Sequence, residues 1–203
     1  MDNNSVSTEI ERYLEYKLNL GESELKKELL RNLDFCTAEK GAHLLETGER
    51  PDQLYILWSG ICRGFLVDEN GQDTTDCFAV HRGDVLWGCG PLDEPSIIGM
   101  EALTDCELLQ ISMEELLRMM QKCDGMRMIN RCLSQALEEH WTMRLMLCQN
   151  DAMKRYLWFL DRYPGLVDQV NKRHIASFLG MTPVSLSRLR KKLREREDAA
   201  AIS

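Results

Sequence analysis

The chain has 203 residues, 44% of them hydrophobic, and a formal net charge of −8, which suits one large or two small packed domains. No apolar run approaches the ~20 residues that a membrane-spanning helix needs, and the polar, acidic start MDNNSVSTEIERY lacks a signal-peptide core. These features exclude membrane-spanning and secreted proteins, and we expect a cytoplasmic protein without a membrane partner.

The first third of the chain passes from helical to strand-like patterns. Within residues 6–33, apolar residues such as Ile10, Tyr13 and Leu14 recur at helical spacing. From Phe35 to Ser112, short apolar runs alternate with turn signals. The pair Asn70-Gly71 predicts a hairpin turn with positive φ at both central residues. Many short strands at near-regular spacing predict an antiparallel β-roll of the jelly-roll kind.

Helical patterns return after Ser112, and this serine is the expected N-cap of the short helix that follows. We expect Asp124-Gly125 to break this short helix and a long helix to run from Met126 to Gln149. Its apolar residues follow a coiled-coil spacing, which favours a parallel dimer seam; the alternative is a core helix packed on its own β domain. The seam would consist of Ile129, Leu133, Ala136, His140, Met143 and Leu147.

The C-terminal segment predicts two short helices joined by a tight turn, after an amphipathic helix over 151–163. Asn171 suits the N-cap of the first short helix, Gly180 the turn, and Thr182 followed by Pro183 the start of the second. This layout is typical of a DNA-binding helix-turn-helix; the alternative is an ordinary basic helical hairpin.

Charge is concentrated in this segment. Residues 171–196 hold eight Lys/Arg and one acid, a net +7, which leaves −15 on the rest of the chain. A basic module on an acidic body favours local phosphate contacts and an oriented approach to DNA.

Cysteine and histidine patterns do not predict a metal or catalytic centre. The eight cysteines lack CxxC pairs and the four histidines are scattered. We therefore expect reduced thiols, no cofactor and no enzymatic activity. A redox role for one cysteine has no support from spacing.

The order of these motifs resembles the Crp/Fnr family of bacterial transcription regulators. The resemblance rests on GERPDQLYILWSGICRGFLVDENG (48–71), the Arg82-Gly83-Asp84 turn, ALTDCELLQIS (102–112), the long helix and the helix-turn-helix. It implies an α+β chain with an N-terminal cyclic-nucleotide-binding-like β-roll flanked by helices and an all-α DNA-binding domain. The implied domains are a sensor (1–125), a dimerisation helix (126–149) and the helix-turn-helix domain (150–203).

Three departures from the family pattern shape the expected function. Cys89 follows Gly88 where cyclic-nucleotide binders carry glutamate, and Ser96 stands near the place of their phosphate-binding arginine. Because an unpaired buried anion is costly, we expect no cyclic AMP or cyclic GMP in the usual pose. The N-terminal cysteines of the iron–sulfur oxygen sensors are missing, with Cys36 alone in the first sixty residues, whereas His43, His81 and Cys77 leave a haem relative open.

The third departure concerns DNA recognition. Pro183 and Val184 stand where the family carries arginine and glutamate, so the preferred sequence should differ. Arg188, Ser185 and Ser187 are the expected base readers, with Val184 against a thymine methyl. Thr182 completes the interface, and the expected phosphate contacts are Arg190, Lys191, Lys192, Lys172 and Arg173. The few residues after Arg196 predict little or no β-hairpin wing.

If the roll keeps a pocket, we expect an apolar or aromatic effector; a filled core is the alternative. The expected walls are Phe78, Val85, Leu86, Trp87, Cys89, Ile98 and Met100, closed by Arg131 and Gln135. The sequence thus predicts a homodimeric, effector-modulated regulator of a palindromic operator, with RNA polymerase as a possible partner. The alternative is an effector-binding or protein-interaction module whose DNA-binding head is degenerate.

Overall fold

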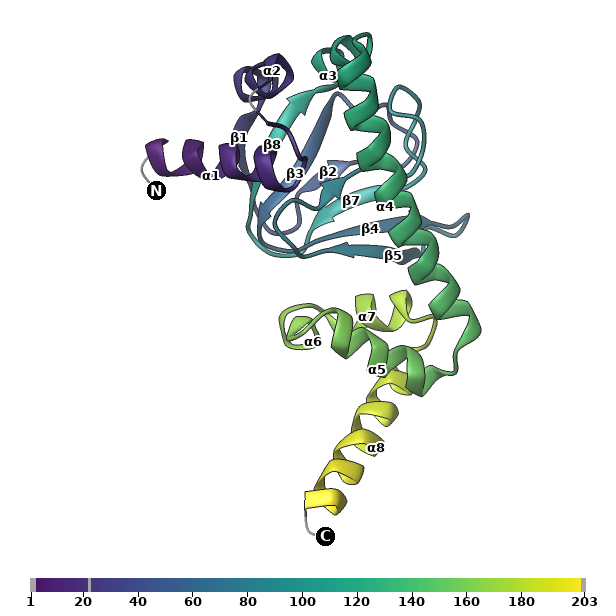
Figure 1. The fold of residues 1–203 in the computed structure, drawn as a ribbon. Coiled ribbons are helices and arrows are strands. Elements are labelled where there is room, and N and C mark those ends of the chain that lie inside the picture. Colours follow the sequence, from purple (N-terminus) through teal and green to yellow (C-terminus); the bar gives the residue numbers. More distant parts are fainter. Residues whose placement is uncertain (1–2, 22, 202–203) are drawn as a thin grey trace. The chain divides into compact units, whose positions relative to one another are not determined.

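A computed structural model describes residues 3–21 and 23–201, with side chains described at 8–21 and 23–195 (Figure 1). Two compact units make up the chain. The first consists of Met1–Gly64 and Phe78–Glu139, and the second of Phe65–Cys77 and His140–Ser203.

Strands fold into two four-stranded sheets. The strands are β1 (Asp34–Ala38), β2 (His43–Leu45), β3 (Gln53–Ser59), β4 (Cys62–Val67), β5 (Asp73–Ala79), β6 (Val85–Leu86), β7 (Gly99–Ala102) and β8 (Cys106–Ser112). One sheet has the order β1-β8-β3-β6 and the other β2-β7-β4-β5. β8 pairs antiparallel with both β1 and β3, with Leu109 opposite Phe35 and Ile56. The predicted antiparallel β-roll is confirmed.

Helices cover the sheet that contains β1, β8 and β3 (Figure 1). They are α1 (Asn3–Tyr16), α2 (Glu24–Asn32) and α3 (Met113–Met120). Leu14, Leu29, Trp58, Leu109 and Met119 belong to one buried apolar cluster. Ser112 caps α3 as predicted, because its Oγ accepts the Glu115 N–H at 3.2 Å.

The 68–72 hairpin forms, but its turn differs from the predicted one. Gly71 has φ +77, whereas Asn70 is not among the residues with positive φ. The Gly71 N–H donates to the Asp68 carbonyl, and the Asp68 carboxylate accepts the N–H groups of Asn70 and Gln72 at 2.9 and 2.8 Å. These bonds suit a turn in which one residue, the glycine, is left-handed. Positive φ at Asn70 was therefore a wrong prediction.

The long helix α4 (Cys123–Gln149) begins before the residues expected to break it. Gly125 lies inside its first turn, where a Cβ would stand 2.1 Å from the Met119 carbonyl oxygen. The glycine permits the close approach of α4 to the end of α3 and does not interrupt the helix.

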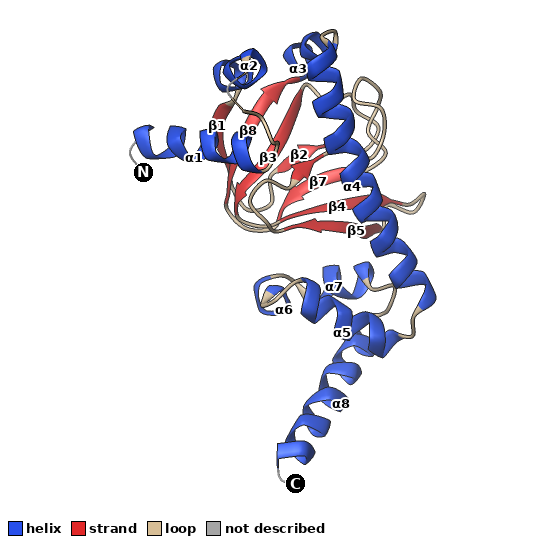
Figure 2. Ribbon diagram, in the orientation of Figure 1, coloured by secondary structure: helices blue, strands red, loops and turns tan. Residues whose placement is uncertain are grey.

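The second unit is helical after His140 as far as residue 201, and no strand occurs in that described stretch (Figure 2). Its helices are α5 (Ala152–Arg162), α6 (Leu166–Gln169), α7 (Lys172–Phe178) and α8 (Pro183–Ala201). Asp151 caps α5 by accepting the Lys154 N–H at 3.0 Å. The predicted α+β class is confirmed. Over the described ranges, every helix is too short or too polar to cross a membrane.

Candidate nucleic-acid interface and roll cavity

The turn between α7 and α8 follows the predicted chemistry. Asn171 caps α7 through the Arg173 N–H at 3.0 Å, and Gly180 leaves that helix with φ +63. The N–H groups of Gly180 and Met181 donate to Ser177 and Ala176, which is the paired bonding of a Schellman end. Thr182 then caps α8 by accepting the Ser185 N–H at 3.1 Å. This is the geometry of a helix-turn-helix.

Buried apolar side chains fix the second helix of this motif. Leu186 of α8 is fully buried, as are Ile175 and Leu179 at α7. Phe178 stands 5.9 Å from the ring of Phe159 and 6.0 Å from that of Tyr163. The aromatic cluster holds α7 against α5, so the outer face of α8 is presented on a rigid support.

Nine of the ten predicted DNA-contacting residues are exposed. Thr182 is engaged as the cap of α8, and Val184 is 60% exposed. The remaining exposed residues are Ser185, Ser187, Arg188, Lys191, Lys192, Lys172 and Arg173.

Arg190 is the exception. Its side chain is largely buried and its Nη2 lies 3.7 Å from a carboxylate oxygen of Asp168, next to α6. Its Nη1 is buried without a hydrogen-bond partner. The helix period turns this side chain toward the protein, so we now interpret it as a support for α8.

The predicted dimer seam lies on a face of α4 that is largely covered within the single chain. Ile129 belongs to the apolar cluster of the first unit. In the second unit Met143 and Leu147 are buried, and the Tyr163 hydroxyl lies 4.0 Å from the Met143 sulfur. Leu133, Ala136 and His140 are half-buried, and the His140 Nδ1 faces a carboxylate oxygen of Asp76 at 3.7 Å. The exposed apolar residues of α4 include Leu137, Trp141 and Leu145.

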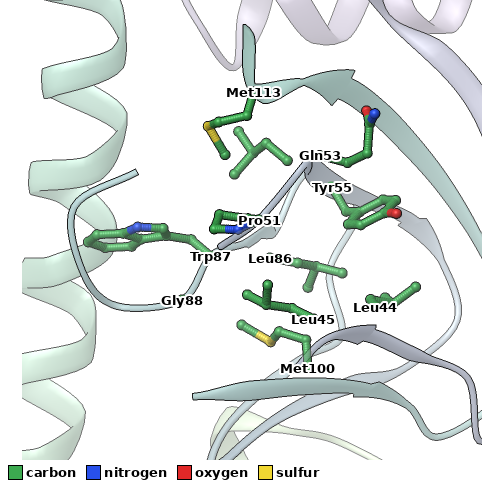
Figure 3. Close-up of a pocket in the computed structure, with 11 residues that line it drawn as sticks. Leu44, Leu45, Pro51, Gln53, Tyr55, Leu86, Trp87, Gly88, Met100 and Met113 are labelled. Atoms are coloured by element: carbon green, nitrogen blue, oxygen red, sulfur yellow. The ribbon is translucent and has the colours of Figure 1, made fainter. Parts of the chain in front are cut away.

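A cavity in the roll lies among β2, β3, β6, β7 and the start of α3 (Figure 3). Its volume of about 10 Å³ suits one water molecule. The side chains of Leu45, Leu86 and Met100 gather on one side, with Trp87 beside the Gly88 turn. The eleven lining residues are Leu44, Leu45, Pro51, Gln53, Leu54, Tyr55, Leu86, Trp87, Gly88, Met100 and Met113, and none of them is a cation.

Three of the predicted wall residues, Leu86, Trp87 and Met100, line this cavity. Phe78 and Ile98 are buried in the fold, and Val85 and Cys89 are half-buried, but these four do not line it. Arg131 and Gln135 are exposed; Arg131 donates to the Leu18 carbonyl, and the Gln135 Nε2 donates to Glu139 on its own helix at 3.3 Å. Sequence reasoning missed, among others, Leu44 and Tyr55, which come from different sheets and meet at the cavity because the two sheets stack, and Pro51, which lies just before β3.

The segment that corresponds to the family's phosphate site is closed on itself. Ser96 is buried, and its hydroxyl donates to the Ile98 carbonyl at 2.6 Å. The Ile97 N–H donates to the Gly88 carbonyl and the Ser96 N–H to the Glu49 carbonyl. A Cβ at Gly88 would stand 2.2 Å from the Ser96 Oγ. The Ser96 hydroxyl and the N–H groups of Ser96 and Ile97 are thus engaged within the protein.

The histidines considered for a haem relative are exposed and face carboxylates. The His43 Nδ1 lies 2.7 Å from Glu46, and the His81 Nδ1 lies 3.6 Å from Asp84. Cys77, on β5, is half-buried.

Comparison with known proteins supports this architecture. Residues 35–123 match the family described as the cyclic nucleotide-binding domain. No curated relative matches the sequence of the chain.

Several solved structures share the fold. FixK2 from Bradyrhizobium japonicum has a TM-score of 0.70 at 19% identity, over 81% of this chain and 86% of its own. The c-di-GMP-responsive global regulator CLP from Xanthomonas campestris has a TM-score of 0.66 at 17% identity, over 84% and 91%. A CRP-family transcriptional regulator from Thermus thermophilus has a TM-score of 0.62 at 17% identity, over 80% and 85%.

The resemblance read from the sequence is thus confirmed by a domain match over the roll and by structural likeness over most of the chain. Residues 35–123 match the cyclic nucleotide-binding domain family, and the chain as a whole has the fold seen in the structures of Crp/Fnr-type regulators.

Proposed function

We propose that this protein is a sequence-specific DNA-binding transcription regulator of the Crp/Fnr type. The observation that carries the proposal is the capped helix α8, whose exposed face presents Ser185, Ser187 and Arg188 from a buried support. A helix held in this way by a helix-turn-helix fits the major groove. Such a regulator works in the cytoplasm, and RNA polymerase is the further partner that it would contact at a promoter.

Arg188 is the proposed principal reader, because a guanidinium pairs bidentately with the O6 and N7 of guanine. Ser185 and Ser187 supply hydroxyls to neighbouring base edges, and Val184 offers an apolar contact to a thymine methyl. Lys172, Arg173, Lys191 and Lys192 are exposed and would hold phosphates.

The regulator would act as a homodimer on a palindromic operator. Leu137, Trp141 and Leu145 recur at four-residue spacing, so they lie along one side of α4. Trp141 is 60% exposed, and the predicted seam residues Ile129, Met143 and Leu147 are already covered. We therefore place the dimer contact on the side of α4 that carries Trp141.

If the roll binds an effector, the small cavity within the roll must widen to admit it. The cavity of about 10 Å³ has no cation in its lining, and the Ser96 hydroxyl and the N–H groups of Ser96 and Ile97 already donate within the protein. This supports an apolar effector and argues against cyclic AMP. A ligand that binds an opened roll better than the closed one would shift the population of the two states.

Selection of random DNA duplexes by the purified protein, at two stated salt concentrations, tests the proposal. We expect a palindromic sequence. Replacement Arg188→Ala should then weaken binding to that sequence by about 1–3 kcal/mol and relax the preference at one base pair of each half-site. The control is Lys154→Ala, because Lys154 is exposed on α5 away from the proposed interface.

The proposal would be contradicted if the selection recovers no sequence with the reduced protein alone and also recovers none when it is repeated in the presence of compounds that bind the roll. An unchanged preference in the Arg188→Ala variant would favour the alternative, in which the head is degenerate and the chain is an effector-binding module.

A further inference from the structure

Two cysteines of the first unit lie against each other at the edge of the roll. Cys62 is the first residue of β4 and Cys106 the first of β8. Their Sγ atoms are 3.6 Å apart. Since β4 and β8 belong to different sheets, this contact bridges the two layers of the roll.

Both thiols are buried directly beneath a surface turn. Cys62 is 0% and Cys106 3% exposed. Ser59, which precedes the Gly60 turn, and Asp105, which precedes Cys106, are exposed. A Cβ at Gly60 would stand 2.6 Å from the Cys106 sulfur, so the backbone of this turn lies directly against that sulfur.

The two thiols differ in acidity. The hydrogen bond from the Cys62 thiol holds the pKa of Cys106 below its usual range, while the same contact and burial raise the pKa of Cys62. In contrast, burial raises the pKa of Cys36 and of Cys132. The thiolate is the nucleophile in thiol oxidation, so Cys106 is the attacking member and Cys62 the resolving one.

We propose that Cys62 and Cys106 form a peroxide-oxidisable dithiol. The Cys106 thiolate attacks one oxygen of hydrogen peroxide; the O–O bond breaks, the sulfur becomes a sulfenic acid and hydroxide leaves. The Cys62 thiol then attacks the Cys106 sulfur, the S–OH bond breaks, and the hydroxyl leaves as water with the thiol proton. The pair loses two electrons, and peroxide is reduced to two molecules of water once the hydroxide is protonated.

The geometry suits this reaction. A disulfide needs the sulfurs at roughly 2.0 Å, so the two sulfurs, which now stand 3.6 Å apart, must move closer by about 1.6 Å. The bond would join β4 to β8 and so lock the two sheets together at this edge. The inference is independent of DNA binding.

The test uses the full chain, reduced, desalted and kept in chelator-treated buffer. The protein receives a small molar excess of hydrogen peroxide, and the remaining thiols are alkylated after unfolding. Peptide mass mapping should then show Cys62 joined to Cys106, with two thiols lost per chain and both recovered by dithiothreitol.

Matched variants separate the two roles. In Cys62→Ala we expect Cys106 to stop at a sulfenic acid that dimedone traps, and in Cys106→Ala we expect Cys62 to stay reduced. Cys132→Ala, a half-buried cysteine away from the pair, should leave the cross-link unchanged. Mapping of the wild-type chain decides the proposal even if a core variant fails to fold.

The proposal is overturned if Cys62 and Cys106 are both alkylated in full while the exposed Cys123 and Cys148 are oxidised. It is equally overturned if Cys106 forms its disulfide with any other cysteine.

Discussion

Glu28 carries a buried charge in the first unit. Its side chain is 6% exposed, and its carboxylate lies 2.9 Å from both the Lys122 Nζ and the Arg118 Nη1. The hydrogen bond from Lys122, followed by the attraction of both cations and the bond from Arg118, lowers the pKa of Glu28. This carboxylate ties α2 to the last turn of α3, through Arg118, and to the linker before α4, through Lys122.

The lowered pKa gives this tie a defined dependence on pH. Its contribution is fully present above the unfolded pKa of about 4.3 and is lost as pH falls through the lower folded value. We expect Glu28→Gln to lower the melting temperature at pH 7 and to converge with the wild type in acid, as measured by circular dichroism melts from pH 7 to 3.

Glu24→Gln is the matched control, because Glu24 pairs with Arg31 and Lys27 at the surface, where ion pairs contribute little. A difference between Glu28→Gln and the wild type that stays constant down to pH 3 would rule out the ion-pair account.

At the scale of elements, the close packing at the α3–α4 junction depends on a glycine, Gly125, which has no Cβ. Glycine in a helix is usually worse than alanine by about 1 kcal/mol. At Gly125 the sign should reverse, because a Cβ would stand 2.1 Å from the Met119 carbonyl oxygen. We expect Gly125→Ala to destabilise the chain by roughly 1–3 kcal/mol in urea unfolding.

Ser134→Ala on the same helix is the control, since Ser134 is exposed and alanine is the better helix former. Equal stabilisation by both substitutions would show that the junction relaxes freely.

The helix α8, proposed to read DNA, carries two cations that the sequence pattern assigns alike to phosphate contacts but that differ in the structure. Lys192 is exposed, whereas Arg190 is turned toward Asp168. Each phosphate contact changes the slope of log K against log salt by about 0.9. We expect Lys192→Ala to reduce the slope by about one per half-site and Arg190→Ala to leave it unchanged while lowering the melting temperature. If both variants reduce the slope of log K against log salt by the same amount, Arg190 contacts a phosphate as Lys192 does.

These helices show which structural features can be predicted from local sequence patterns and which cannot. Caps at Ser112, Asn171 and Thr182 follow from short-range hydrogen bonding, and the structure has all three. Gly125 was expected to break a helix, but it lies inside one. A glycine is needed there because the backbone closely approaches Met119 of another helix, which local spacing does not reveal. Likewise a heptad pattern marks one apolar face of α4, but not whether its own domain or a partner covers that face.

The roll cavity was the least predictable feature. Leu44 and Tyr55 reach it only because the sheets stack, and neither carries a sequence signal for ligand binding. The Cys62–Cys106 contact likewise joins residues 44 positions apart. Spacing rules find sites built on one element, not those assembled between sheets.

For the molecule as a whole, the division of charge matters more than its total. The +7 segment at 171–196 is set against −15 elsewhere. If the chain binds DNA as proposed, the acidic remainder would repel the DNA and an approach through the +7 segment would be favoured. A homodimer would present two such segments to the two halves of a palindrome. In the proposed dimer, operator binding would be linked to the contact that α4 makes with its partner.

That contact gives the sharpest prediction at this scale. Replacement Trp141→Glu removes an indole that is 60% exposed in the single chain and places a charge in the proposed contact. Loss of about 1.5 kcal/mol of apolar burial in each of two copies should weaken the dimer by at least a hundredfold. Sedimentation equilibrium should then report the 23.5 kDa monomer at concentrations where the wild type has twice that mass.

The control Leu157→Glu alters an exposed apolar residue of α5 and should stay dimeric. A Trp141→Glu protein that remains dimeric would place the contact on another surface.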